Sequence, residues 1–204
     1  MVKVQKVFEV TYMRKEKLLN IFSNMPTLTT ERLVLRPMRR DDSFDMYQYA
    51  CREDVTEFLL WSPHRSRGYT EEYLKYIESR YAIGDFYDWA IVYKESGKMI
   101  GTCGFANIDT VNNTGELGYV LNPEFRGREL ALEAAREVVR FGFEELSLHR
   151  IEARYMQGND ASRRVMEKLG MTFEGFSRDS MLVKGSYKTI GVCAMIKEEF
   201  KKEE

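Results

Sequence analysis

Seven segments of the chain are predicted to form strands, from polar–apolar alternation at residues 31–37 and from short strand-like runs between turns elsewhere. These segments are residues 31–37, 88–94, 98–108, 115–121, 150–156, 172–183 and 187–197. Turn residues separate the second, third and fourth segments, so these three strands should form an antiparallel meander. The last two strands should form a hairpin through Lys184-Gly185.

Apolar residues at helical spacing predict four helices between these strands. The helices are expected at about 41–51, 70–82, 127–145 and 159–169. The third is the clearest, because Leu130, Ala134, Val138 and Phe141 recur on one of its faces. The elements together predict an α+β fold, in which helices flank a mixed, mostly antiparallel seven-stranded sheet.

Residues 1–25 precede the first strand and are predicted to be an N-terminal extension. A loose apolar stripe that includes Val7, Val10, Leu18 and Ile21 is compatible with a helix over about 3–22. The remaining residues, 26–204, show no internal repeat and no low-complexity segment. Their length suits one domain.

Composition narrows the class of protein. The 204 residues are 44% hydrophobic and carry 31 Lys+Arg against 32 Asp+Glu, which argues against a general nucleic-acid binder. No apolar run approaches the roughly 18 residues of a membrane-spanning helix, and the start lacks the pattern of a signal peptide. The three cysteines form no CxxC pair, so we expect reduced thiols in a cytoplasmic protein.

A candidate anion site lies where the fourth strand meets the long helix. The connecting loop contains Arg126, Gly127 and Arg128. The first N–H groups of a helix lack intrahelical partners and carry the positive end of its dipole, so they suit an anion such as a diphosphate. A capped helix beside solvated arginines would have the same sequence, and the loop alone leaves both interpretations open.

A second candidate segment is GNDASRRVMEKLGM, residues 158–171. Asn159 is placed to cap the helix, and Ser162 lies three residues later on nearly the same face. Taken alone, this pattern favours an amphipathic helix whose serine is merely exposed.

Taken together, these segments resemble the GNAT superfamily of acetyl-CoA-dependent N-acyltransferases. The similarity is greatest to its RimJ/RimL branch of ribosomal-protein N-terminal acetyltransferases. TLTTERLVLRPMRRDD (27–42) is similar to the first strand of that branch, and EKLGM followed by TFEGFSRDS (167–180) is similar to its C-terminal motifs. The resemblance implies an acetyltransferase domain over 26–204, with the fourth and fifth strands splayed apart and acetyl-CoA between them.

The resemblance also implies the residues that bind acetyl-CoA, which is a co-substrate. The family's loop, Arg/Gln-x-x-Gly-x-Gly/Ala, falls on Arg126, Glu129 and Ala131. The implied contacts are Arg126, Gly127, Arg128, Glu129, Leu130 and Ala131 in the loop, the backbone of Tyr119, Val120 and Leu121, and Asn159.

Glu129 departs from the family pattern, which usually has glycine at this position. A carboxylate that faces the diphosphate would repel it, whereas an acidic residue that points outward is favourable in the first turn of a helix. We favour the outward orientation. Glu129 is also the feature that favours an alternative function, a non-catalytic acyl-CoA-binding or regulatory module on the same scaffold.

Two residues are candidates for catalysis. Ser162 occupies the position where the branch places a hydroxyl that can protonate the departing thiolate. Glu116, on the fourth strand, is the candidate base that deprotonates the acceptor amine through water, although a solvent-facing glutamate would look the same. Asp85 and Asp88 are weaker candidates, because carboxylates are common beside turns.

The acceptor is expected to be a small-molecule or peptide primary amine. A peptide α-amine has a pKa of about 7.7–8.0, against about 10.4 for an alkyl amine, and is therefore the easier substrate for a site without a strong base. Phe58, Trp61, Tyr69 and Trp89 are candidates either for the acceptor wall or for the core. No metal site is expected, since His64 and His149 lack ligand spacing.

Two further expectations concern mechanism and assembly. Direct transfer in a ternary complex needs no acetylated cysteine, and Cys103 is expected to be a small strand residue. The protein should be a monomer or a homodimer. A scaffold that assembles through residues 1–25 is a third functional hypothesis.

Overall fold

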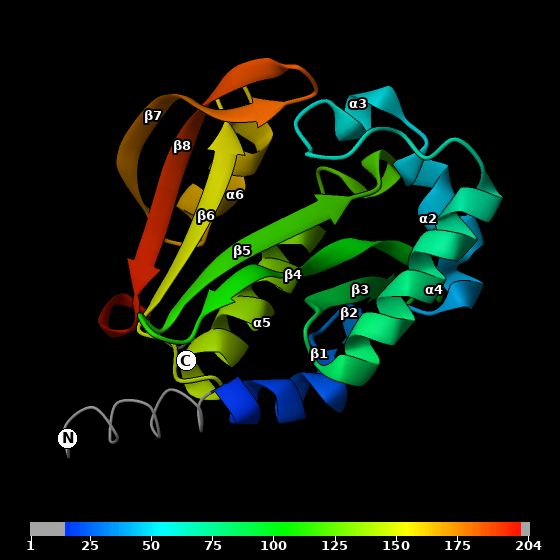
Figure 1. Cartoon of the computed structure of the whole chain (residues 1–204), viewed down its shortest axis with the longest axis horizontal. Coiled ribbons are helices and arrows are strands. Elements are labelled where there is room, and N and C mark those ends of the chain that lie inside the picture. The colour runs from blue at the N-terminus through cyan, green and yellow to red at the C-terminus, as the bar shows by residue number, and fades with distance from the viewer. Residues whose placement is uncertain (1–14, 201–204) are drawn as a thin grey trace, which may run out of the picture.

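Eight strands form one open sheet in the computed structural model, which describes residues 15–200 (Figure 1). The strands are β1 (Leu28–Thr29), β2 (Leu33–Arg36), β3 (Tyr87–Tyr93), β4 (Met99–Asp109), β5 (Thr114–Leu121), β6 (Arg150–Met156), β7 (Thr172–Val183) and β8 (Ser186–Ile196). Their order is β1-β2-β3-β4-β5-β6-β8-β7, and all neighbours are antiparallel except β5 and β6. The predicted mixed, mostly antiparallel α+β sheet is confirmed.

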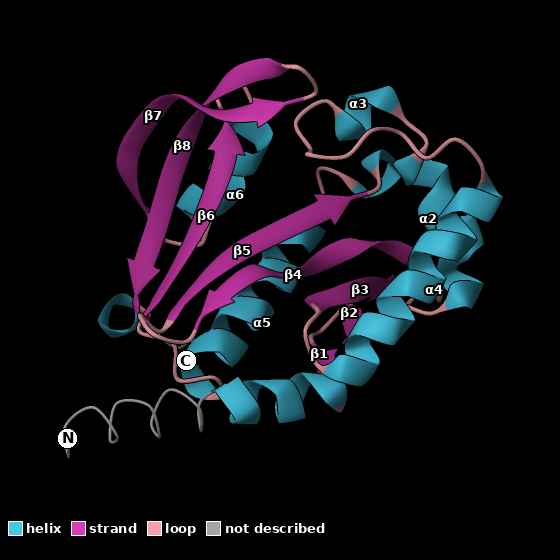
Figure 2. Ribbon diagram, in the orientation of Figure 1, coloured by secondary structure: helices cyan, strands magenta, loops and turns pink. Residues whose placement is uncertain are grey.

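Helices cover both faces of this sheet (Figure 2). They are α2 (Ser43–Ala50), α3 (Glu53–Thr56), α4 (Arg67–Ile83), α5 (Leu130–Glu144) and α6 (Asp160–Lys168), with a further helix over 15–23. In the view of Figure 2, α2 and α4 lie in front of the sheet and α5 and α6 behind it. These two sides are called the front and back faces below.

The structure corrects several predicted boundaries. The sheet has eight strands, not seven, because Leu28–Thr29 adds a strand too short to show alternation. Helix α4 begins at Arg67, earlier than residue 70, because Ser66 caps it by accepting a hydrogen bond from the Tyr69 amide. Helix α5 begins at Leu130, later than residue 127, because Glu129 just before it has left-handed backbone angles.

Strands β5 and β6 pair only at their beginnings. Their parallel ladder runs from Thr114 beside Arg150 to Leu117 beside Ala153. Beyond that point β5 stays with β4 and β6 stays with β8, so the two strands diverge, as Figure 1 shows. This is the predicted separation of the fourth and fifth strands.

The core on the back face includes part of the predicted extension. Phe22, from the helix over 15–23, is fully buried, with its ring centroid 4.7 Å from that of Tyr87 and 5.7 Å from that of Trp89. Gly84 ends α4 with a φ of 81°, and a Cβ there would clash with the Leu19 carbonyl oxygen. The helix over 15–23 therefore packs directly on the sheet and on α4. The part of the expected helix before residue 15 lies outside the described residues.

Candidate active site

The separation of β5 from β6 creates the place where the predicted residues meet. The side chains of β5 alternate between the two faces. Leu117 and Tyr119 share the back face, because they pair with Phe105 and Cys103 of β4. Glu116, Gly118 and Val120 therefore face the front. A ligand between the strands would contact α5 and α6 behind the sheet and the α2–α4 side in front.

The loop before α5 has the backbone shape of an anion site. Gly127 and Glu129 have φ values of 77° and 61°, and Glu129, the N-cap residue, makes no side-chain cap hydrogen bond. The first N–H groups of α5 therefore remain available to an anion. Arg126 and Arg128 are exposed beside them, and the Arg128 guanidinium lies 5.6 Å from the Phe125 ring centroid.

The first two residues of α5, Leu130 and Ala131, are less exposed than the arginines of the loop. The Leu130 side chain is buried in the core, so only its backbone can face the loop. Ala131 is half-buried in the first turn of α5.

The Glu129 carboxylate is paired with a cation across the site. Its Oε1 lies 2.5 Å from the Nζ of Lys168 near the end of α6. This hydrogen bond and the charge of Lys168 lower the pKa of Glu129. The side chain thus contacts α6 instead of capping α5, and its charge is balanced locally.

Ser162 and Tyr119 form a hydrogen-bonded pair at the start of α6. The Tyr119 hydroxyl donates to the Ser162 carbonyl oxygen at 2.9 Å and lies 3.0 Å from the Ser162 Oγ. Asn159 caps α6, since its Oδ1 accepts a hydrogen bond from the Ser162 amide at 3.2 Å. Burial raises the pKa of Tyr119, which keeps the phenol protonated at neutral pH.

The second half of β5 offers backbone to the gap. Tyr119, Val120 and Leu121 pair with Cys103, Thr102 and Gly101 of β4. Within the described chain their other edge has no ladder with β6, whose pairing stops at Leu117. Backbone N–H and C=O groups on this edge can contact an extended ligand.

Glu116 lies on the front face, where β5 and β6 are still paired. Its Oε2 is 3.7 Å from the Nε of Arg154 on β6, and its register neighbour is Glu152. Burial raises the pKa of Glu116, the charge of Arg154 opposes that rise, and Glu152 adds to it. The side chain is half-buried and close to the divergence point.

Aromatic residues gather on the α3–α4 side of the site. The His64 ring lies 5.3 Å from that of Trp61, 5.0 Å from Tyr69 and 5.6 Å from Tyr73. His64 itself is buried, its Nδ1 lies 2.9 Å from the Thr70 hydroxyl, and burial lowers its pKa. A neutral histidine therefore holds this cluster together.

The β7–β8 hairpin approaches the same side. At its turn, the Nζ of Lys184 donates to the Thr56 carbonyl oxygen of α3 at 2.5 Å. Phe58 packs with Met156, Val183 and Ile190 from β6, β7 and β8. Together these contacts connect α3 to the hairpin across the front of the gap.

The remaining candidates are core or surface residues. Trp89 is core: it is fully buried on the back face and its Nε1 donates to the Pro26 carbonyl oxygen at 2.7 Å. Cys103 is also buried, and burial raises the pKa of its thiol. His149 is exposed. Residues 15–200 contain no cluster of metal-binding side chains.

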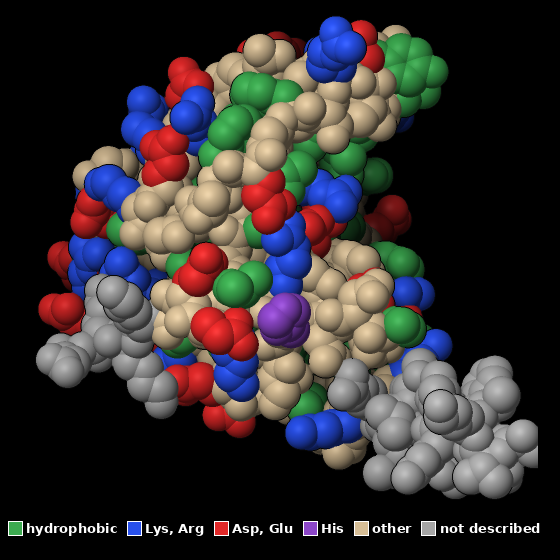
Figure 3. Space-filling view, turned by 90° about the vertical axis from the view of Figure 1, so that its left-hand side faces the viewer, with side chains coloured by type: hydrophobic (Ala, Val, Ile, Leu, Met, Phe, Trp, Pro, Cys, Tyr) green, Lys and Arg blue, Asp and Glu red, His purple; other side chains and the backbone are tan. Residues whose placement is uncertain are grey.

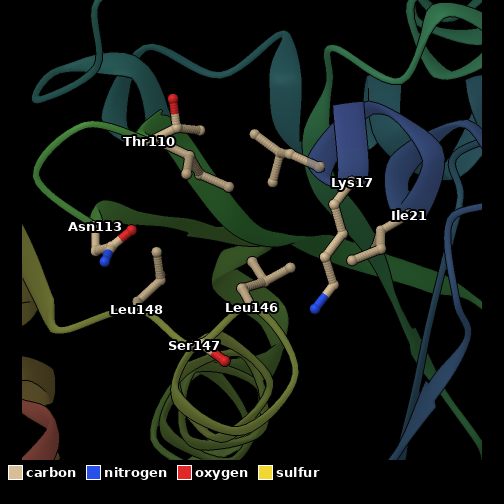
Figure 4. A pocket seen from close by; sticks show the side chains of 9 residues that line it. Lys17, Ile21, Thr110, Asn113, Leu146, Ser147 and Leu148 are labelled. Carbon is tan, nitrogen blue, oxygen red and sulfur yellow. The ribbon is translucent and has the colours of Figure 1, made fainter. Parts of the chain in front are cut away.

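A separate cavity of about 180 Å³ lies at the opposite end of β5 (Figure 4). Its walls come from the helix over 15–23, the β4–β5 turn and the loop after α5, and include Leu18, Asn113 and Leu148. It contains none of the candidate residues.

Surface charge agrees with the balanced composition. On the side shown in Figure 3, where β7 and β8 lie, Lys and Arg side chains alternate with Asp and Glu. No helix in the described part of the chain is long and apolar enough to cross a membrane.

Comparisons with known proteins agree on one family. Residues 32–172 match the family described as "Acetyltransferase (GNAT) domain". An uncharacterized N-acetyltransferase p20 from Bacillus licheniformis is 32% identical, over 86% of this chain and 99% of that protein. A [Ribosomal protein uS5]-alanine N-acetyltransferase from Escherichia coli is 27% identical, over 81% of this chain and 89% of that protein.

A solved structure shares the fold. The crystal structure of a GNAT-family acetyltransferase from Bacillus anthracis superposes with a TM-score of 0.76 at 25% identity, covering 85% of this chain and all of that one.

Proposed function

The chain belongs to the GNAT acetyltransferase family and is an N-acetyltransferase, and from that premise we propose that it transfers an acetyl group from acetyl-CoA to a primary amine in a ternary complex. The observation that supports this most is the divergence of β5 and β6 beside the uncapped start of α5. Within residues 15–200, a backbone edge without a ladder partner and helix N–H groups without a side-chain cap then lie beside one gap, which supports binding of an extended anion there.

The chain's own groups fit acetyl-CoA at this gap. The α5 N–H groups with Arg126 and Arg128 would bind the diphosphate, because an anion is stabilised at a helix N-terminus. The edge of Tyr119, Val120 and Leu121 would bind the pantetheine arm. A β5 backbone N–H near Tyr119 would also donate to the thioester oxygen, whose negative charge grows as the amine attacks. Asn159 would hold the start of α6 in place.

Ser162 and Tyr119 are proposed to stabilise the departing thiolate. The thiolate takes a proton as the C–S bond breaks, and the Ser162 hydroxyl, which lies beside the Tyr119 hydroxyl, can donate a hydrogen bond to it. Neither hydroxyl is a strong acid, so the pair acts by hydrogen bonding and relay.

Glu116 is proposed to accept a proton from the acceptor nitrogen through water. Its position on the front face puts it on the side of α3 and α4, where Trp61 and Tyr69 would contact an acceptor. Burial raises its pKa and so makes the carboxylate a better base.

A peptide or amino-acid α-amine is the proposed acceptor. Such an amine is neutral far more often at pH 7 than an alkyl amine, since its pKa is about 7.7–8.0. One relative is named for acetylating an alanine of ribosomal protein uS5, which supports the same class. Because Lys168 balances the charge of the Glu129 carboxylate, Glu129 no longer favours the alternative function, a non-catalytic acyl-CoA-binding or regulatory module.

Two assays test this function. Acetyl-CoA at about 100 times its dissociation constant should stabilise the fold by about 2.7 kcal/mol, or a melting shift of roughly 5–10 °C. Thiol release should then follow addition of an amine from a panel of peptides, amino acids and polyamines. Absence of both the shift and thiol release would refute the proposal.

A further inference from the structure

A pair of polar side chains on the front face, Asp88 and Tyr49, has no role in the mechanism described so far. It lies where β3 meets α2 and α4. Asp88 Oδ1 and the Tyr49 hydroxyl are both buried there, and neither has a hydrogen-bond partner within residues 15–200. Tyr49 is 1% exposed. Two unpartnered buried polar atoms are unfavourable in a fold, which suggests that they serve a ligand.

Asp88 is connected to the proposed transfer site through a row of two glycines. Asp88 pairs with Gly104 of β4, and Gly104 pairs with Gly118 of β5. The Asp88 side chain leans over this row, because a Cβ on Gly104 would stand 2.9 Å from Asp88 Oδ1. Neighbouring strands are about 4.8 Å apart, so the carboxyl group lies roughly one strand from Gly118.

The space over Gly118 is open. A Cβ built there meets no atom within 4 Å in the described chain. Gly118 is the first residue of β5 after its pairing with β6 ends. An acceptor nitrogen in this space would have Asp88 on one side and the β5 edge, where the thioester is proposed to bind, on the other.

The groups around Asp88 carry no positive charge. Tyr49 faces it from α2, Tyr73 and Tyr81 from α4, and Thr102 and Cys103 belong to neighbouring β4. The Tyr81 hydroxyl is already used, since it accepts from the Met38 amide and donates to the Asp88 carbonyl oxygen.

These surroundings determine how Asp88 titrates. Burial raises its pKa to about 7, while the Thr102 hydroxyl and the Trp89 amide oppose that rise. Burial also raises the pKa of each tyrosine and of Cys103, so all of these stay neutral. Of this group, Asp88 alone changes charge near neutral pH.

We propose that Asp88 binds the acceptor's ammonium group and takes its first proton, with Tyr49 hydrogen-bonding the nitrogen. The inference rests on the proposed function and adds a catalytic residue to it. It also explains why a carboxylate without a cationic partner is enclosed at this point of the fold.

The two carboxylates then have separate tasks. An ammonium group loses one proton to become the neutral amine that attacks, and this proton goes to Asp88. After the C–N bond forms, the nitrogen loses a second proton, which goes through water to Glu116. The C–S bond breaks, the thiolate takes up one proton, and the other proton is released to solvent. The products are the amide, free CoA and one proton.

The same arrangement favours α-amines. Proton transfer from an α-ammonium group with a pKa of about 7.7–8.0 to a carboxylate with a pKa near 7 has an equilibrium constant of about one tenth. For an alkyl ammonium group with a pKa of about 10.4, the constant is below one thousandth. Asp88 thus discriminates between acceptor amines by their basicity.

Asp88→Asn is the direct test, because it keeps the size of the side chain and removes the base. For a peptide α-amine, kcat/KM should fall about a hundredfold near pH 6.5, and the loss should shrink towards pH 9 as the free amine deprotonates unaided. The melting shift with acetyl-CoA should stay the same, since Asp88 does not contact that ligand. Tyr49→Phe should raise the acceptor KM several-fold.

Asp85→Asn is the matched control. Asp85 also has a buried Oδ1 without a hydrogen-bond partner in residues 15–200, but its other oxygen is paired with Arg80 at 2.6 Å. This variant should retain wild-type kcat/KM. A loss in Asp88→Asn that is the same at every pH, or no loss at all, would overturn the proposal. Failure of the proposed function would look different, because the wild type itself would then acetylate no amine.

Discussion

Ser162 is placed where a single hydroxyl can affect turnover without affecting binding. Its amide is held by Asn159, and its Oγ lies beside Tyr119. Ser162→Ala should lower kcat about ten- to a hundredfold, because the thiolate loses a hydrogen-bond donor. The dissociation constant of acetyl-CoA, measured by calorimetry, should change less than twofold.

Tyr119→Phe provides the companion measurement. It removes the hydroxyl that supports Ser162 and keeps the ring, so it should lower kcat in the same direction by a smaller factor. Unchanged turnover in both variants would assign the pair a purely structural role.

The left-handed backbone conformation of Glu129 changes the effect on stability that is expected when glycine replaces it. In an ordinary first turn of a helix, replacement by glycine would destabilise the fold. Glu129 instead has a φ of 61°, a conformation that glycine adopts without strain. Glu129→Gly should therefore raise the melting temperature by roughly 2 °C, despite the lost contact with Lys168.

The affinity for acetyl-CoA should change less than tenfold in this variant, because Lys168 already balances the carboxylate. Glu129→Gln is the control, since it removes the charge and keeps the backbone strain. A fall in melting temperature in Glu129→Gly, measured by calorimetry, would contradict this account of the loop.

At the scale of elements, the sequence predicted most of the sheet. Strands β3, β4, β5 and β6 begin and end within one residue of their predicted limits, because short apolar runs and turn residues are local signals. Strand β1 was missed, since two residues cannot alternate. Helix α4 begins before its predicted start at residue 70 because Ser66 caps it, which the sequence pattern around Ser66 did not indicate.

Such local signals could not predict side-chain contacts between segments that lie far apart in the sequence. The Tyr119 hydroxyl meets Ser162 across 43 positions, and Lys168 meets Glu129 across 39. The sequence identified Ser162 and Glu129, and Tyr119 through its backbone alone, but it predicted neither side-chain pairing. It also rated Asp88 as a common turn carboxylate, because only the packing of α2 and α4 encloses it.

The divergence of β5 from β6 yields a prediction about Gly118. Valine suits a strand and has room there, so Gly118→Val should keep or raise the free energy of unfolding, by up to roughly 1 kcal/mol. The same side chain would fill the space proposed for the acceptor, so kcat/KM for the amine should fall at least tenfold. Chemical denaturation and steady-state kinetics measure the two effects. A variant that is stable and fully active would show that the acceptor binds elsewhere.

At the scale of the whole molecule, Asp88 should make stability depend on pH. Its pKa is about 7 in the folded protein, against an ordinary value of 3.8. Between these values the folded state holds a proton that the unfolded chain releases, so stability falls as pH rises from about 4 to about 7. Above pH 7 the loss is complete, at up to about 4 kcal/mol.

Asp88→Asn should remove this dependence. The variant should be more stable than the wild type at about pH 8, and the difference should vanish near pH 4. Urea denaturation at the two pH values measures it. A variant less stable than the wild type at both would mean that the carboxylate supports the fold instead of straining it.

The central claim is direct transfer of acetyl from acetyl-CoA to an α-amine, and two-substrate kinetics with product analysis test it most directly. The protein is mixed with acetyl-CoA and a peptide that has a free N-terminus, while both concentrations are varied. We predict a sequential pattern, with acetylated peptide and free CoA formed in equal amounts and no acetyl group on Cys103 or any other residue. A ping-pong pattern with an acetylated protein intermediate, or acetylation of polyamines in preference to α-amines, would contradict the account.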